Sequence, residues 1–85
     1  MWRSGNLELN GRQYIFEIMM NEFPGRLGIF GGRIIQLYLY DDQDRTVAEY
    51  SKLTWTVAPE KGTDAYELVK VITKEHNFRK RKYAA

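Results

Sequence analysis

The hydrophobic pattern of this chain changes its period once, at Pro59, and that change limits the folds open to it. Before Pro59, apolar and polar residues alternate over several short stretches, which is the pattern of strands with one buried face. After Pro59, apolar residues recur at i, i+3, i+4 and i+7 along one helical stripe: Ala65, Leu68, Val69 and Ile72. The sequence therefore predicts an α+β fold, an antiparallel, meander-like sheet with one C-terminal helix packed on one face.

About four strands are expected before Pro59. Asn10-Gly11 is the preferred pair for a two-residue type I′ turn, so a hairpin is predicted over residues 6–20. The following strands are expected over residues 33–40 and 46–51, and residues 53–57 are expected to continue the last strand past an irregularity.

The helix is predicted to begin at Asp64, after Thr63 as its N-cap, and to end at about Asn77. Its apolar stripe needs one face of the sheet as a partner. That face is expected to consist of Phe16, Ile18, Ile35, Leu37 and Trp55, or of the residues that alternate with them.

Length and charge indicate one small domain over residues 1–78, followed by a basic, flexible tail at 79–85. The tail carries four consecutive cations: Arg79, Lys80, Arg81 and Lys82. Without them, the rest of the chain has nine basic residues and eleven acidic ones. No cysteine is present, which excludes disulfides and thiolate metal sites. No apolar segment resembles a signal peptide or a membrane span, so a cytoplasmic location without membrane contact is expected.

The stretch "GRLGIFGGRI", from Gly25 to Ile34, holds four glycines within eight residues. It lacks the lysine, the hydroxyl and the following helix of a Walker A loop, and the strand–helix context of a dinucleotide fingerprint. One interpretation is that the glycines supply positive φ angles in a long connection between strands. The other is a loop that binds an anion or an acidic protein, and its candidate residues are Arg26, Gly28, Phe30, Gly31, Gly32 and Arg33.

No catalytic constellation is visible in the sequence. His76 is the only histidine and lies near the predicted helix end, where it more often stabilises the helix dipole than acts as a base. The acidic run from Asp41 to Asp44 has the wrong spacing for a calcium loop and is interpreted as a solvated turn. Glu17 and Glu49 lie on different predicted strands, and nothing in the sequence shows that they meet. We therefore expect no enzyme, no metal and no cofactor.

Aromatic residues are unusually frequent, twelve of 85. Tyr38 and Tyr40 share one face of their predicted strand, and Tyr14 is expected beside them if the register permits. Because a single helix covers only one face of a sheet, these tyrosines form a candidate patch on the other face. They could fill the core, meet a protein, or stack on bases.

The order of these features resembles a family of small uncharacterised domains from bacteria and their mobile elements. The family pattern has an opening aromatic, a hairpin, the motif GI-x-GGRI before a strand, an aromatic segment, a proline and a closing helix. Gly28–Ile34 matches that motif, and Tyr50, Trp55 and Pro59 follow in the family order. The chain departs from the pattern at Ile35-Gln36, where the family has Ser-Lys, and at Ser51, where it has an acidic residue. The resemblance implies the order of the fold and no activity.

These observations favour a small non-enzymatic binding module from a bacterium or its phage or plasmid. Its partner is expected to be a protein or a second copy of the chain, met through the open sheet face and the glycine loop. The alternative is a nucleic-acid-binding accessory protein that uses the basic tail with Arg26 and Arg33. A third hypothesis is a minimal enzyme or small-ligand binder at the glycine loop.

Overall fold

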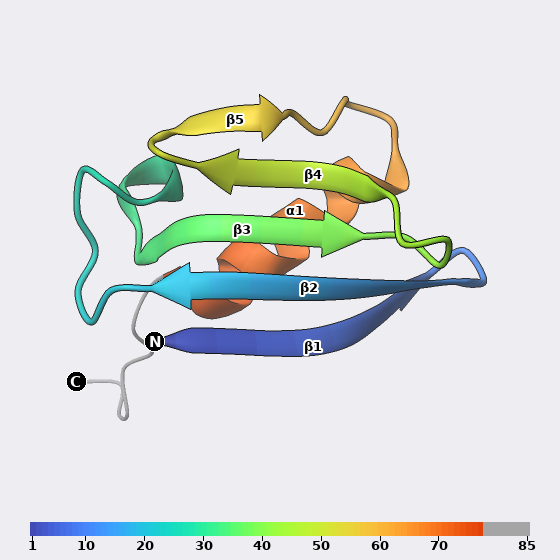
Figure 1. Cartoon of the computed structure of the whole chain (residues 1–85), viewed down its shortest axis with the longest axis horizontal. Coiled ribbons are helices and arrows are strands. Elements are labelled where there is room, and N and C mark those ends of the chain that lie inside the picture. Colours follow the sequence, from blue (N-terminus) through green and yellow to red (C-terminus); the bar gives the residue numbers. More distant parts are fainter. Residues whose placement is uncertain (78–85) are drawn as a thin grey trace.

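The computed structural model describes residues 1–77 as one twisted antiparallel sheet with a helix across its back (Figure 1). Neighbours in the sheet are neighbours in the chain: β1 (Trp2–Leu9), β2 (Arg12–Met20), β3 (Ile34–Tyr40), β4 (Thr46–Ser51) and β5 (Thr54–Val57), followed by α1 (Asp64–His76). The predicted α+β meander with one C-terminal helix is therefore confirmed. The predicted tail at 79–85 lies outside the described residues.

The sheet has five strands, and the prediction of four was wrong. Lys52 and Leu53 adopt positive φ angles of 54° and 68°, which turn the chain back on itself. The segment that was expected to continue β4 therefore pairs antiparallel with it, so that Tyr50 lies opposite Trp55. The sequence did not predict this turn, because it contains no glycine, proline or asparagine. Lys52 and Leu53 occupy the left-handed region instead.

The first hairpin follows the prediction at its turn and extends it at its start. Asn10 and Gly11 have φ angles of 53° and 78°, as a type I′ turn requires. β1 begins at Trp2 rather than at residue 6, and the pairing with β2 continues as far as Trp2 opposite Met19. β1 is an edge strand whose first residues are exposed, so its sequence carries no alternation there.

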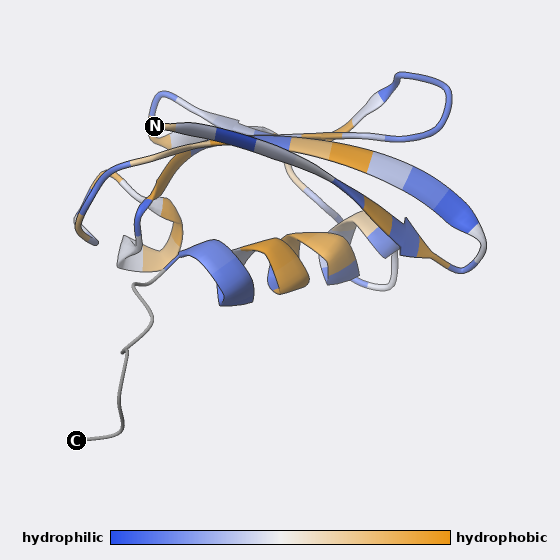
Figure 2. Cartoon of the chain, turned by 90° about the horizontal axis from the view of Figure 1, so that it is seen from below, coloured by the Kyte–Doolittle hydropathy of each residue, from blue (hydrophilic) through white to orange (hydrophobic). Residues whose placement is uncertain are grey.

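The core lies between α1 and one face of the sheet (Figure 2). α1 contributes its predicted apolar stripe, and Thr63 caps it by accepting a hydrogen bond from the backbone N–H of Tyr66. The sheet contributes buried side chains from three strands: Tyr14, Phe16, Ile18, Met20, Ile34, Leu37, Leu39, Ala48 and Tyr50. Trp55 on β5 is half-buried and packs edge-on against Tyr50, with ring centroids 5.2 Å apart.

Ile35 does not face the core, contrary to prediction. Ile34 lies opposite Met20 and Gln36 opposite Met19, so Ile35 is one extra residue on β3 at a bulge. The bulge shifts the alternation by one residue, and Ile34 takes the buried position. Beyond the bulge the expected alternation resumes, and Leu37 is buried as predicted.

The acidic turn between β3 and β4 is organised by Asp41, which is buried rather than solvated. One carboxylate oxygen, Oδ1, accepts hydrogen bonds from the backbone N–H groups of Gln43 and Arg45, both at 2.9 Å. The other, Oδ2, accepts one from Nε of Arg45 at 3.0 Å. The backbone hydrogen bond from Arg45 is the main cause that lowers the pKa of Asp41 below its ordinary value of 3.8.

We expect Asp41→Asn to destabilise the fold at neutral pH. A carboxyl whose pKa is lower in the folded state contributes stability above its unfolded pKa, and this contribution disappears as the pH falls through the folded value. The difference in melting temperature between the two proteins should therefore shrink once the pH drops below about 3.8. Thermal unfolding followed by circular dichroism checks this, with Asp42→Asn as the exposed control. A difference that stays constant from neutral to acid pH would contradict the assignment.

Candidate functional site

The glycine loop between β2 and β3 is closed by its own backbone hydrogen bonds. The N–H of Asn21 donates to the carbonyl of Arg33 at 2.8 Å, and the N–H of Gly25 donates to the carbonyl of Gly32 at 3.2 Å. A short 3₁₀ turn, η1 (Ile29–Gly31), lies between them. The loop is therefore a folded connection with internal partners, unlike a cradle whose N–H groups point towards a ligand.

Two of the loop glycines are required by close approach of the chain to itself. A Cβ atom on Gly28 would collide with the carbonyl group of Gly32, and one on Gly32 would collide with the side chain of Asn77. Of the four loop glycines, all expected from the sequence to have positive φ angles, only Gly31 has one, at 70°. Gly25 has open space around it. The motif thus holds the loop tightly against the end of α1.

Asn77 is the residue that this packing surrounds, and its exposed fraction is 1%. Its Oδ1 accepts a hydrogen bond from the backbone N–H of Ile34 at 3.1 Å, and its Nδ2 donates to the carbonyl of Ile29 at 2.8 Å. Its backbone carbonyl accepts from the N–H of Arg33 at 2.7 Å. The sequence did not reveal this role, although Asn77 directly follows His76, the last residue of α1, and an asparagine just past the end of a helical pattern is a known C-terminal signal.

The remaining candidates in the loop are divided between structural and exposed positions. Arg33 is half-buried, and its Nε donates to the carbonyl of Asn21 at 3.0 Å, so it braces the loop. Arg26 is exposed. Phe30 is 74% exposed and adopts a left-handed φ of 53°, beside a shallow groove along α1 that Lys70, Val71 and Lys74 also line. Arg26 and Phe30 are thus the candidates that can meet a partner.

Tyr14 does not lie with Tyr38 and Tyr40, so the predicted tyrosine patch is corrected. Ile15 is the residue opposite Tyr40, and Tyr14 points to the other face, where it is 5% exposed. There its hydroxyl donates to Oδ2 of Asp64 at 3.1 Å. Burial and the neighbouring Asp64 raise the pKa of Tyr14, so it stays a neutral donor. Tyr38 and Tyr40 do share the face that α1 leaves uncovered.

We call that uncovered surface the open face, and its centre consists of side chains from four strands: Trp2, Ile15, Glu17, Tyr38, Tyr40 and Glu49. The rings of Trp2 and Tyr38 are stacked, with centroids 6.3 Å apart. The hydroxyl of Tyr40 donates to Oε1 of Glu17 at 3.4 Å, and burial together with Glu17 raises the pKa of Tyr40. Trp2 was missed because it precedes the predicted hairpin.

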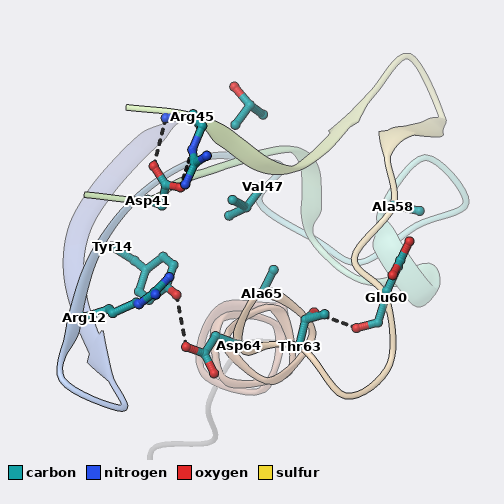
Figure 3. Close-up of a pocket in the computed structure, with 11 residues that line it drawn as sticks. Arg12, Tyr14, Asp41, Arg45, Val47, Ala58, Glu60, Thr63, Asp64 and Ala65 are labelled. Atoms are coloured by element: carbon teal, nitrogen blue, oxygen red, sulfur yellow. Dashed lines mark hydrogen bonds and ion pairs between the residues drawn. The ribbon is translucent and has the colours of Figure 1, made fainter. Parts of the chain in front are cut away.

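A polar pocket of about 550 Å³ opens at the other end of the sheet from the glycine loop (Figure 3). The turn region after β1, the turn after β3 and the start of α1 bring together charged groups that are distant in sequence: Arg12, Asp41, Arg45, Glu60 and Asp64. Most of them already have partners, because Asp64 accepts from Tyr14 and Asn10 while Asp41 is held by Arg45. The bonds to Asp64 tie the first hairpin to the helix start, whereas the bonds of Asp41 stay within the β3–β4 turn, so the lining of the pocket is held by its own polar contacts.

We expect Asn77→Ala to destabilise the fold by about 1–3 kcal/mol, because it leaves the buried N–H of Ile34 without its side-chain acceptor. The carbonyl of Ile29 loses one of two hydrogen bonds and keeps the one from the N–H of Gly32. Urea unfolding followed by circular dichroism measures the change. Asn6→Ala, on exposed β1, is the control and should stay within about 0.5 kcal/mol of the parent. A loss no larger for Asn77→Ala than for Asn6→Ala would refute the role of the amide.

The two glycines Gly32 and Gly25 provide a matched pair for the same measurement. Gly32→Ala should cost at least about 2 kcal/mol, because the new methyl group overlaps the Asn77 side chain. Gly25→Ala meets nothing and should be neutral or up to about 1 kcal/mol more stable, since alanine restricts the unfolded chain. Equal effects at the two positions would show that close packing is not what requires glycine.

Comparison with known proteins gives a family for this chain. Within residues 1–77, no helix combines the length and the apolar character needed to cross a membrane. No curated protein and no solved structure matches the sequence. The sequence model of one family, Domain of unknown function (DUF7678), matches residues 1–77. Because that match spans every residue of the sheet and the helix, the chain belongs to this family of domains of unknown function.

Proposed function

We propose that this domain is a non-enzymatic binding module whose partner is a protein, met through the open face. The observation that carries the proposal is the stacked pair Trp2 and Tyr38 on a sheet face that α1 does not cover. Trp2 is 53% exposed and Ile15 is 46% exposed, so apolar surface remains in contact with water. Tryptophan and tyrosine are enriched where proteins meet, because their rings bury large areas at small cost in conformational entropy.

Several side chains of the open face are held in place by contacts within the domain. Tyr38 is fixed by its ring contact with Trp2 and by the hydrogen bond from its hydroxyl to Oε1 of Gln36, at 3.0 Å. Tyr40 is fixed through Glu17. Side chains that are already ordered lose little freedom when a partner binds, which increases the affinity obtained from each contact. All of them stand on strands rather than on loops.

The glycine loop is not part of the proposed interface. Its buried glycines and Arg33 hold the loop to β3 and α1, and Phe30 lies beside the outer side of the helix. The open face lies on the opposite side of the sheet from that helix. A partner seated on Trp2 and Tyr38 would therefore not contact Phe30 as part of one continuous patch.

Binding rather than catalysis fits the environment of the titratable groups that the sequence singled out. His76 is half-buried and packs its ring on Phe16 at 5.7 Å between centroids. Glu17 and Glu49 lie on β2 and β4 with Tyr38 between them, two strand spacings or about 10 Å apart. His76 thus serves the packing against Phe16, and the two glutamates stand apart on either side of Tyr38. A cytoplasmic location and a bacterial, phage or plasmid origin remain predictions from the sequence.

The nucleic-acid alternative has the basic residues of the sequence in its favour. Arg79, Lys80, Arg81 and Lys82 lie outside the described residues, and Arg33 is already engaged with Asn21. The open face presents Glu17 and Glu49, which would repel phosphates. An electrophoretic shift at low salt that is lost when the four tail cations are replaced by glutamine would favour this alternative over the protein partner.

We expect Trp2→Ala and Tyr38→Ala to abolish self-association or to reduce capture of a specific partner at least tenfold. Light scattering of the purified chain measures self-association, and affinity capture from nuclease-treated extract with mass spectrometry measures partners. Phe30→Ala is the control, because it removes an aromatic that is even more exposed than Trp2 from the helix side. A monomer that captures nothing, or a partner lost equally with Phe30→Ala, would contradict the use of the open face.

A further inference from the structure

We infer that the open face recognises a cationic protein segment, one that presents arginine or lysine side chains to Tyr38 and its neighbours. This inference rests on the proposed function and specifies the chemistry of the partner. It comes from the distribution of charge on the two sides of the sheet, which neither the sequence nor the family match assigns.

The charged side chains at the paired strand positions of the open face are all carboxylates. The register places Glu8 opposite Gln13, Glu17 opposite Ser4, and Glu49 opposite Tyr38, all on the side away from α1. Among the strand residues paired on that side within residues 1–77, no lysine or arginine occurs. Two cations lie at the rim: the N-terminal ammonium group of Met1, which donates to Sδ of Met19 opposite Trp2 at 3.2 Å, and Arg3. The backbone position of Arg3 pairs with buried Ile18, and its side chain borders a small hollow beside Trp2 and Glu17.

The carboxylates are arranged around the aromatic rings. Tyr38 has Glu17 opposite it on β2 and Glu49 opposite it on β4. The backbone of each glutamate lies one strand spacing, about 5 Å, from the backbone of Tyr38. Trp2 stacks against Tyr38 and borders the same hollow as Glu17. An aromatic surface with a carboxylate on either side is thus built from four neighbouring strands.

This combination matches a guanidinium or ammonium group better than any other side chain of proteins. A guanidinium stacks its plane on an aromatic ring while its N–H groups donate to carboxylates at the ring edge. Oε1 of Glu17 already accepts from Tyr40, which orients the carboxylate and leaves its other oxygen for a partner. Glu49 adds a second acceptor across the ring. An acidic segment or a phosphate would meet the same carboxylates and be repelled.

The helix side of the molecule supplies the contrast. Lys70 pairs with Glu67 at 3.6 Å, and Lys74 lies in the groove beside Phe30. Lysines and glutamates therefore stand side by side on α1. On the open face, every charged side chain at a paired strand position is a carboxylate. A basic partner should distinguish the two sides by charge, and this provides a matched control for the test.

The test uses the full chain and a short capped peptide of alternating arginine and serine. Binding is measured by titration calorimetry, and its place by backbone amide shifts in NMR spectra. The expected result is binding at low ionic strength that weakens with salt and shifts amides of β2, β3 and β4. A matched peptide with citrulline, which keeps the shape of arginine without its charge, should bind at least fivefold more weakly.

The double variant Glu17→Gln with Glu49→Gln should weaken the arginine peptide about fivefold, the effect of two surface charge pairs. The control is Glu67→Gln with Glu75→Gln, which removes the same charge from exposed positions of α1 and should change affinity less than twofold. Equal weakening by both double variants would reduce the effect to net charge and overturn the inference. Equal binding of the citrulline peptide would overturn it as well.

Two further outcomes separate this inference from the proposed function. If Tyr38→Ala abolishes a captured partner while the Glu17 and Glu49 variants do not weaken it, the partner is not cationic and only the inference fails. If replacing the four cations of residues 79–82 with glutamine shifts the amides of β2, β3 and β4 in the NMR spectra of the free chain, the chain's own tail occupies the face, and the assignment to a separate partner is overturned. Binding of the arginine peptide that weakens in the Glu17 and Glu49 variant, with those amides unmoved by the tail replacement, supports the inference.

Discussion

The buried side chain of Asn77 joins the end of α1 to the glycine loop and to the start of β3, which lie 48 and 43 residues earlier in the chain. Its amide bonds to the glycine loop at Ile29 and to the start of β3 at Ile34, and it directly follows the last turn of α1. A buried amide without these partners would be costly, so the loop, the strand and the helix end must adopt one arrangement together. The close packing of Gly28 and Gly32 is a consequence of that arrangement.

Once α1 is fixed in this way, the two faces of the sheet become chemically different. One face is filled by the helix stripe, and the other keeps Trp2, Tyr38 and Tyr40 at the surface. The hydrogen bonds from Asn10 and Tyr14 to Asp64 fix the opposite end of the helix to the first hairpin. A rigid sheet that is anchored at both ends of its helix is a suitable base for a binding surface, because its exposed side chains are held in place before a partner arrives.

Local patterns were sufficient for the element types and insufficient for the candidate site. Asn10-Gly11 and the stripe from Ala65 to Ile72 were correctly interpreted, because a turn and an amphipathic helix depend on nearby residues. Ile35 and Tyr14 were assigned to the wrong faces. A single extra residue at a bulge moved Ile34 into the core, and the register of β2 with β3 put Ile15, not Tyr14, beside Tyr40.

The sequence by itself determined that strands precede one helix, the turn at Asn10-Gly11 and the covering of a single sheet face, but not the reversal at Lys52-Leu53 that makes the fifth strand, since hydrophobic period and turn chemistry are local properties. Only the tertiary structure decided that the glycines serve close packing around Asn77, and that Trp2, Glu17, Tyr38 and Glu49 come together on the open face. Those contacts join different strands and depend on register, bulges and the position of the helix. Register, bulges and helix position are set by the packing of the whole domain, so no short segment of the chain is sufficient to predict them.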